Sequence, residues 1–367
     1  MRGLYIHIPF CVSKCFYCDF YSLVVTSDLM DRYIDALLAE AGGYRGMNFE
    51  TLYIGGGTPS ILGTERLEEL VYGLGRIFIF NDLKEATIEV NPESAGTDVL
   101  EAIHRLGIGR ISVGVQSLND DELKKSGRAH NRRQALQAID KASSSGFHNI
   151  SADIIIGLPG QTKQSLGETL NVLTGAGVKH VSAYCLSVEE GTAFCRYPPS
   201  DLPGEDEQAG LYTYAVEILQ GCGLIQYEIS NFARPGNQCL HNLNYWRGGE
   251  YLGLGPAAAS HIDGERFRNA ADLERYLADP LNVREGEERL KDDRKAGEEA
   301  ILRLRLIQEG LDLREITGRY SCSAVNRLEA RLNELVKRRS LVREGDVFRL
   351  QPACVLTSNS VFIDVLE

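Results

Sequence analysis

Positive charge is in short supply in this chain of 367 residues. It contains 39 Lys and Arg against 51 Asp and Glu, which gives a formal net charge of −12 and a pI near 5.2. A protein whose main partner is a nucleic acid needs a basic surface to meet the phosphates. The composition therefore argues against nucleic acid as a partner.

Long apolar runs are also missing, although a hydrophobic content of 43% is enough for a sizeable core. No run approaches the length of a membrane-spanning helix, so we expect at most peripheral contact with a membrane. Only Met1, Arg2 and Gly3 precede the first strand-like run, which leaves no room for a signal or transit peptide. We therefore expect a cytoplasmic protein with one large domain and one or two small additions.

The cysteines do not suggest a secreted disulfide framework, because there are nine of them and three crowd into Cys11-Val-Ser-Lys-Cys15-Phe-Tyr-Cys18. Three such thiolates can hold three corners of an iron–sulfur cluster and leave one iron open to an outside ligand. The usual fourth cysteine is missing, since position 20 is Phe20 and the next cysteine is Cys185. Two alternatives stay open: a tetrahedral zinc site, which needs a fourth ligand, and three buried structural thiols.

Strand-like and helix-like segments alternate through the first half of the chain. Short apolar runs are separated by segments with helical periodicity, such as the stripe Leu67, Leu70 and Leu74. This alternation predicts an α/β fold with a parallel sheet, and about six units fit before residue 190, short of an eight-unit barrel. We therefore predict a partial, six-unit parallel β/α barrel. Its expected strands are 4–8, 51–54, 87–90, 110–115, 150–156 and 180–186.

Unusual residues follow five of the predicted strands: the cysteine loop, the triple glycine 55–57, Glu89, Gln116 and Asp153. The carboxyl ends of parallel strands meet at one edge of the sheet, where α/β proteins bind ligands. Taken singly, each feature has a plainer explanation, such as a glycine turn, a core salt bridge of Glu89, or a cap or salt bridge of Asp153. Their coincidence at five strand ends favours a binding site.

The second half of the chain predicts additions to this core. Two acidic segments, 201–207 and 285–293, have the composition of linkers. Arg234-Pro-Gly begins a loop that should carry residues 241–246, and the segment 251–256 is punctuated by glycines. A helix over 208–219 and a strand over 226–229 extend the core.

A small module is expected at the C-terminal end. Three helical stretches after residue 291 and a hairpin that turns at Gly345-Asp346 predict a winged-helix-like α+β module. From residue 291 on there are 14 Lys and Arg against 13 Asp and Glu. Because this balance is nearly neutral, packing or partner docking is favoured over DNA binding.

The cysteine loop and the stretch from Tyr5 to Phe20 resemble the radical S-adenosylmethionine (SAM) superfamily, in the branch that contains oxygen-independent coproporphyrinogen III oxidase and haem chaperones. The resemblance implies a 4Fe–4S cluster on Cys11, Cys15 and Cys18, with SAM on the open iron. It also implies a radical SAM core over 1–235, a connecting segment with a haem-binding motif over 236–290 and the winged-helix-like domain over 291–367.

The same resemblance assigns residues to SAM, with Gly56, Gly57 and Thr58 at its methionine amino group and Tyr17 in place of a phenylalanine. The residues so assigned are Tyr5, Tyr17, Gly56, Gly57, Thr58 and Glu89. Three others match positions that contact a second SAM in the oxidase, namely Gln116, Arg128 and Asp153. Whether a second SAM binds this chain stays open.

The string His241-Asn-Leu-Asn-Tyr-Trp246 contains the only tryptophan of the chain. Imidazole is a common axial ligand of haem and aromatic rings suit a porphyrin face, but a lone histidine is more often a hydrogen-bonded structural residue. The string resembles the His-Asn-x-x-Tyr-Trp motif of the haem chaperones in this branch, which implies haem binding at His241. Cys239 is a weaker candidate. The remaining histidines, which we expect to be structural, are His7, His104, His130, His148, His180 and His261.

Two departures distinguish the two functions that the resemblance offers. The oxidase has a further cysteine two residues after the third, where this chain has Phe20, and a long N-terminal extension that this sequence lacks. Both favour a haem chaperone that carries a 4Fe–4S cluster and SAM and passes haem to acceptor apoproteins, which we expect in the respiratory chain. The alternative is the oxidase itself, in which the cofactor generates a radical that attacks the propionate side chains. The sequence does not determine the oligomeric state.

Overall fold

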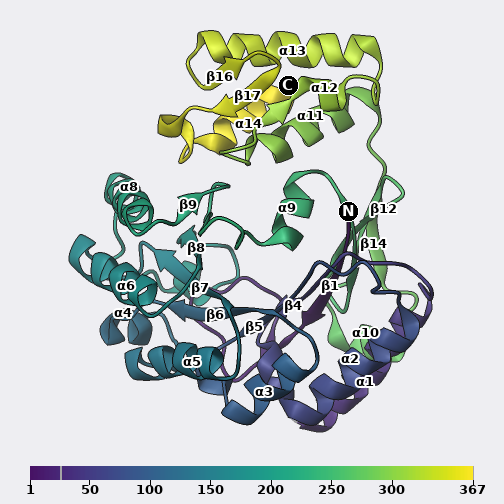
Figure 1. Ribbon diagram of the computed structural model, residues 1–367, viewed down its shortest axis with the longest axis vertical. Helices are drawn as coiled ribbons and strands as arrows, with labels where there is room; N and C mark the ends of the chain where they lie inside the picture. The colour runs from purple at the N-terminus through teal and green to yellow at the C-terminus, as the bar shows by residue number, and fades with distance from the viewer. Residues whose placement is uncertain (25–26, 367) are drawn as a thin grey trace.

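The computed structural model describes residues 1–24 and 27–366. A large curved sheet carries helices on its outer side, and a smaller group of elements lies above it in Figure 1. Six strands are parallel and adjacent in the order β1-β4-β5-β6-β7-β8, which confirms the predicted six β/α units. They are β1 (Arg2–Ile8), β4 (Thr51–Gly56), β5 (Glu85–Val90), β6 (Arg110–Gln116), β7 (Asn149–Ile156) and β8 (His180–Cys185).

Helices connect these strands, as the alternation of segments predicts. The helix α1 begins at Ser27, so Ser27 and Asp28 lie within its first turn. The helices of this part are α1 (Ser27–Gly42), α2 (Gly63–Ile77), α3 (Thr97–Arg105), α4 (Asp120–Lys125), α5 (Arg132–Ser144), α6 (Lys163–Gly175), α7 (Ala193–Arg196) and α8 (Glu205–Gly221). The acidic residues expected in a linker at 201–207 partly belong to α8, whose first turn contains three acids that suit the positive end of the helix dipole.

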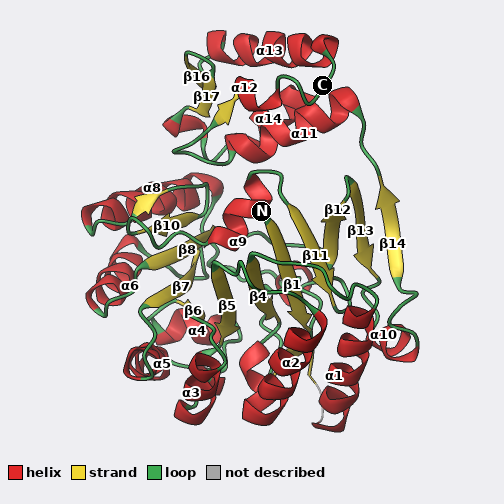
Figure 2. Cartoon of the chain, turned by 45° about the vertical axis from the view of Figure 1, so that its right-hand side comes forward, coloured by secondary structure: helices red, strands yellow, loops and turns green. Residues whose placement is uncertain are grey.

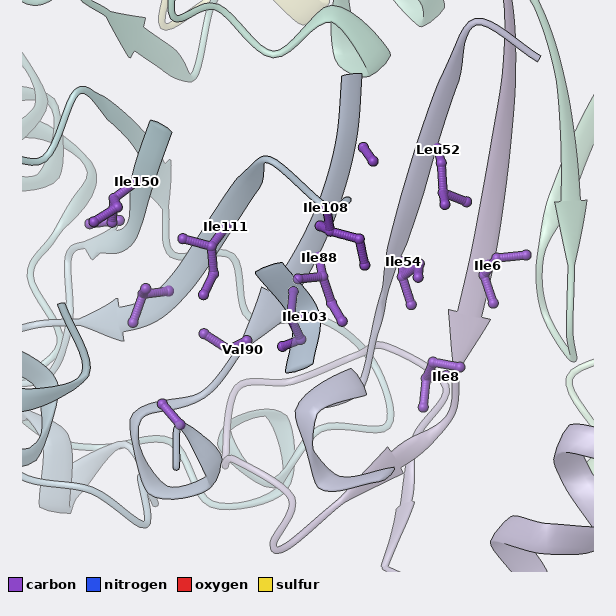
Figure 3. Close-up of a cluster of buried hydrophobic side chains, with 14 of the residues drawn as sticks. Ile6, Ile8, Leu52, Ile54, Ile88, Val90, Ile103, Ile108, Ile111 and Ile150 are labelled. Carbon is purple, nitrogen blue, oxygen red and sulfur yellow. The ribbon is translucent and has the colours of Figure 1, made fainter. Parts of the chain in front are cut away.

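Side chains alternate between the two faces of each central strand. Ile6, Ile54, Ile88 and Ile111 are fully buried, and Figure 3 shows them gathered with Ile103 of α3 in the layer between strands and helices. Their neighbours in the strands, such as Tyr53 of β4 and Glu89 of β5, lie on the opposite face and line the inside of the curved sheet. The apolar side chains of the strands thus form the core against the helices, while the side chains on the inner face can line a binding site.

The sheet continues beyond both ends of the six-strand core, as Figure 2 shows on the side of β1. Here β11 pairs with β1 in parallel, and the predicted loop over 241–246 was wrong, because Leu240–Trp246 forms the helix α9. The linker predicted at 285–293 was also wrong, since it forms an edge strand and the start of a helix. A charged, exposed edge strand has no apolar alternation that would reveal it. The added elements are α9 (Leu240–Trp246), β11 (Glu250–Leu254), β12 (Ala259–Ile262), β13 (Glu265–Asn269), α10 (Leu273–Ala278) and β14 (Arg284–Glu288).

At the opposite edge, β10 (Asn231–Ala233) pairs antiparallel with β8, and β9 (Ile225–Gln226) pairs antiparallel with β10. The strand predicted over 226–229 is therefore too long. The chain turns after Gln226, where the Asn231 amide donates to the carbonyl of Glu228.

The C-terminal module has its own apolar core, which runs from Ala296 to Val365. Its hairpin turns at Gly345 and Asp346 as predicted, and β15 joins that hairpin in a three-stranded sheet. The helix α14 was not anticipated. The elements of the C-terminal module are α11 (Asp292–Leu304), β15 (Leu311–Asp312), α12 (Leu313–Ile316), α13 (Cys322–Lys337), β16 (Leu341–Glu344), β17 (Val347–Leu350) and α14 (Ser358–Leu366). The exact domain boundaries stay predictions.

Among the helices of the described chain, none combines the length and the apolar character that crossing a membrane requires.

Candidate functional site

The cysteine loop follows β1 at the carboxyl end of the central strands. The short strand β2 (Phe10–Cys11) begins this loop and pairs with β3 (Leu23–Val24). Backbone bonds fix the loop, since the Thr58 amide donates to the Phe10 carbonyl (2.7 Å) and the Phe16 amide to that of Ser126 (3.1 Å). The free thiols of the three cysteines surround one cavity of about 340 Å³. The sequence prediction that they act together fits this arrangement.

Burial controls the protonation of these thiols. It raises the pKa of Cys11, which hydrogen bonds from Thr58 and Ser22 lower only in part, and raises the pKa of Cys18 to about 11. Iron binding at these positions would therefore release protons. Among residues 1–24 and 27–366, no three His, Cys, Asp or Glu side chains converge to share a single metal ion. In a cluster each cysteine would bind a different iron, so the three thiols need not converge on one point, whereas a zinc ion needs four ligands around it.

The triple glycine ends β4 directly against the cysteine loop. A Cβ at Gly57 would lie 2.6 Å from the Phe10 carbonyl oxygen and 3.0 Å from Cys11 Sγ, so only glycine fits there. Gly56 and Gly57 both line the cavity. Thr58 lies behind Cys11, and its hydroxyl donates to Cys11 Sγ over 3.5 Å.

Glu89 projects from β5 into the same cavity. Its Oε1 accepts a hydrogen bond from the Tyr53 hydroxyl (2.7 Å), and its Oε2 accepts one from the Gly56 amide (3.0 Å). Burial, with the nearby charge of Asp153, raises the pKa of Glu89 to about 7. The glycine turn and the carboxylate therefore form one hydrogen-bonded unit rather than two separate features.

Asp153 of β7 and Gln116 of β6 line the cavity on its next wall. The two oxygens of the Asp153 carboxylate accept from the Ser112 hydroxyl at 3.0 and 3.1 Å. Burial raises the pKa of Asp153 more than the hydrogen bonds from Ser182 and Ser112 lower it. Gln116 has a φ of 64° and lies where the register between β6 and β7 shifts. A left-handed conformation is uncommon for glutamine, and such strain gathers at ligand sites.

The two tyrosines expected beside SAM occupy different places. Tyr17 lines the cavity together with Arg128, whose Nη1 donates to Cys15 Sγ over 3.3 Å. Tyr5 lies deeper in the sheet, where its hydroxyl is 2.9 Å from His7 Nδ1. Burial raises the pKa of the Tyr5 hydroxyl, which therefore stays protonated.

His241 lies at the other end of the central strands, on α9. Its imidazole is 1% exposed; Nδ1 is 2.9 Å from Thr51 Oγ1 at the start of β4, and Nε2 is 2.7 Å from the Tyr245 hydroxyl. Burial and the positive charge of Arg110 lower the pKa of His241 to about 3, so the ring is neutral. The Glu85 carboxylate accepts from the first amides of α9. This helix therefore closes the amino end of the barrel, and the structure does not bring His241 to the cysteine cavity.

Asn91 is a cavity residue that the sequence analysis did not single out. It stands two residues after Glu89, just beyond the end of β5, where other site residues were expected. The signal was therefore present, but an asparagine followed by proline is also an ordinary turn.

Comparison with known proteins agrees with the fold and the cysteine loop. The model of the radical SAM superfamily matches residues 5–173. The chain is 33% identical over 365 residues to the heme chaperone HemW of Lactococcus lactis, covering 98% of this chain and 96% of that protein. It is 38% identical over 278 residues to the HemW of Escherichia coli, covering 72% of each.

Among solved structures, coproporphyrinogen III oxidase (HemN) from Escherichia coli superposes with a TM-score of 0.87 over 99% of this chain and 89% of that chain, at 23% identity. This likeness establishes a shared fold. The sequence identities, together with the superfamily match, show that the chain belongs to the HemW family of the radical SAM superfamily.

Proposed function

We propose that the protein is a haem chaperone, which binds haem beside a 4Fe–4S cluster and SAM and transfers the haem to acceptor apoproteins of the respiratory chain. The observation that carries this proposal is the similarity to a heme chaperone over nearly the whole chain, 365 residues at 33% identity. A match of this extent includes the C-terminal module as well as the radical SAM core.

The residues around the cavity fit the cofactors that the superfamily implies, a 4Fe–4S cluster and SAM. Cys11, Cys15 and Cys18 would hold three irons, and no further cysteine of the loop competes for the fourth, because Phe20 takes the next place on the cavity wall. When bound, the cluster supplies an open iron for the amino and carboxylate groups of SAM and an electron for its sulfonium.

The protein's own part in SAM binding follows from the wall that faces the cysteines. Gly57 lets the backbone come close to the ligand, while the Gly56 amide and the Tyr53 hydroxyl fix the orientation of Glu89. A carboxylate held in this way can accept hydrogen bonds from the amino or ribose groups of SAM. Gln116 and Asp153 extend the same wall and are proposed contacts of a second SAM.

The proposed haem contact at His241 needs a change in the structure. Both ring nitrogens are hydrogen-bonded within the protein, so an iron could reach Nε2 only after the Tyr245 hydroxyl leaves it. The α9 segment lies between the barrel and α11 of the C-terminal module. A movement that frees Nε2 would therefore open a space at the junction of these two parts. His241 therefore stays a proposed haem contact, conditional on this opening.

One experiment separates the chaperone from the oxidase. Protein with a reconstituted cluster is given SAM, a reductant and coproporphyrinogen III without oxygen, and in parallel is loaded with haem and mixed with an apo-haem protein. The proposal predicts haem transfer and no protoporphyrinogen, because the cysteine of the oxidase is Phe20 in this chain. Steady formation of protoporphyrinogen without haem transfer would assign the chain to the oxidase reaction.

A further inference from the structure

Two of the three loop cysteines are joined by a chain of hydrogen bonds through Arg128, Asn91 and Thr58. Arg128 Nη1 donates to Cys15 Sγ (3.3 Å), and Arg128 Nη2 donates to Asn91 Oδ1 (2.9 Å). Asn91 Nδ2 then donates to Thr58 Oγ1 (2.7 Å), and the Thr58 hydroxyl donates to Cys11 Sγ (3.5 Å). Residues from three different loops thus meet at the sulfur atoms.

The guanidinium sets the direction of the bonds that lead from it to Thr58, and a deprotonated Cys11 can only accept. A guanidinium has donors only, so the oxygen of Asn91 must face Arg128 and its amide nitrogen must face Thr58. The Thr58 oxygen accepts from that nitrogen, which leaves its single proton for Cys11. Both ends of the chain therefore present a hydrogen to sulfur, and one end also carries a full positive charge.

The surroundings hold this arrangement in place. Thr58 is 1% exposed, and Arg128 Nη2 also donates to the Gly114 carbonyl (2.8 Å). A Cβ on Gly114 would lie 2.5 Å from Asn91 Oδ1, so the asparagine side chain fits only because glycine stands there. An arginine guanidinium stays protonated in proteins, so this end of the hydrogen-bonded chain keeps its positive charge.

We infer that Arg128, Asn91 and Thr58 form a bridge that positions Cys11 and Cys15 and raises the reduction potential of the cluster. This inference rests on the proposed function, since it requires the cluster on the loop cysteines. Hydrogen bonds and positive charge at cysteine sulfur stabilise the more negative, reduced state of an iron–sulfur cluster. Arg128 is then a positioning residue of the cluster, whereas the resemblance to the oxidase assigns it to a second SAM.

The test is a redox titration of the reconstituted cluster without SAM, followed by electron paramagnetic resonance. Arg128→Met should move the midpoint to a more negative potential, by a tenfold or larger change in the ratio of oxidised to reduced cluster, which is about 59 mV for one electron. Arg105→Met is the matched control, because it removes the same charge from an exposed arginine of α3.

A second pair of variants covers a failure of Arg128→Met to assemble its cluster. Thr58→Val keeps the shape of the side chain but removes the hydroxyl, and should shift the midpoint in the same direction, whereas Thr58→Ser should not. Equal midpoints for Arg128→Met and Arg105→Met, or for Thr58→Val and Thr58→Ser, would overturn the bridge. A loss of SAM affinity in Arg128→Met with an unchanged midpoint potential would indicate that Arg128 contacts SAM and does not tune the cluster. Wild-type protein that assembles no cluster would overturn the proposed function itself, and the bridge with it.

Discussion

The Nε2 atom of His241 lies 2.7 Å from the hydroxyl oxygen of Tyr245, one turn further along α9. The other ring nitrogen, Nδ1, is hydrogen-bonded to the hydroxyl of Thr51 at the start of β4. The histidine of the proposed haem motif is therefore part of the closure of the barrel. Any haem that uses this imidazole must compete with an internal hydrogen bond.

The hydrogen bond between Tyr245 and His241 predicts in which direction haem binding should change when Tyr245 is substituted. Tyr245→Phe keeps the aromatic ring but removes the hydroxyl from Nε2, so it should bind haem faster or more tightly than wild type if His241 is the ligand. His241→Ala should lose or shift the Soret band. Absorbance titrations with haem measure both effects.

Thr51→Val is the matched control, because it removes the hydrogen bond to Nδ1 and leaves Nε2 as it is. Unchanged Soret spectra in both Tyr245→Phe and His241→Ala, with a lower stability of the latter, would restrict His241 to a structural role. Cys239 and His261 would then be the next residues to test.

The cluster prediction concerns metal content. Cys15→Ala should abolish the bound iron and sulfide, which in wild type should be about four of each per chain, because the loop offers no substitute thiolate. Cys322→Ala is the control, since Cys322 is exposed on α13, in the C-terminal module. Full iron content in Cys15→Ala, or zinc as the bound metal of the wild type, would contradict the assignment.

The SAM prediction concerns the wall opposite the cysteines. Gly57→Val should weaken SAM binding at least tenfold, about 1.4 kcal/mol, because its side chain would meet the Phe10 carbonyl and Cys11 Sγ. Glu89→Gln should weaken binding as well, since it replaces one carboxylate oxygen by an amide group. Calorimetry on the protein with its cluster gives the affinities, with the exposed Glu101→Gln of α3 as control. Equal SAM affinity with and without the cluster would move the site elsewhere.

The sequence predicted the inner architecture well because the signals there are local. Short apolar runs alternate with helical stripes along the chain, and unusual residues such as Glu89 stand at the strand ends, so both the sheet and its functional edge could be predicted. Contacts between distant segments carry no such signal. The pairing of β11 with β1 joins residues about 250 positions apart. The glycine-rich segment 251–256 has no local pattern that would predict a strand.

The same limit applies to the site. The cysteine loop, Gly57 and Glu89 could be assigned to one cavity, whereas the contact of Arg128 with Cys15 spans 113 positions and depends on the fold. For His241 the sequence shows an aromatic motif, but its burial against Thr51 depends on where α9 packs.

A buried carboxylate outside the cavity predicts a dependence of stability on pH. Glu40 of α1 is 3% exposed and accepts hydrogen bonds from the Tyr276 hydroxyl (2.6 Å), Asn269 Nδ2 (2.7 Å) and the Gly255 amide (2.9 Å). Burial raises its pKa from the ordinary value of 4.5 to about 7, although these donors and the charge of Arg284 lower it in part.

The sign follows from proton linkage. Between these two pKa values the folded protein binds more protons at Glu40 than the unfolded chain does, so this residue's contribution to stability is present at low pH and is lost as pH rises through the window. At about 1.4 kcal/mol per pKa unit the loss is on the order of 3 kcal/mol. Glu40→Gln should reduce the loss of stability across this window by this amount, whereas the exposed Glu217→Gln should leave it unchanged. Urea midpoints measured at pH 5 and pH 7.5 provide the comparison, and parallel slopes in wild type and Glu40→Gln would contradict it.

The central claim is that this chain binds haem, and the most direct measurement is a haem titration of the anaerobically purified protein with its cluster in place. We expect a Soret band that saturates at one haem per chain and disappears from the protein when an apo-haem protein is added. Absorbance that rises without saturation, as for haem that adsorbs non-specifically, would contradict it.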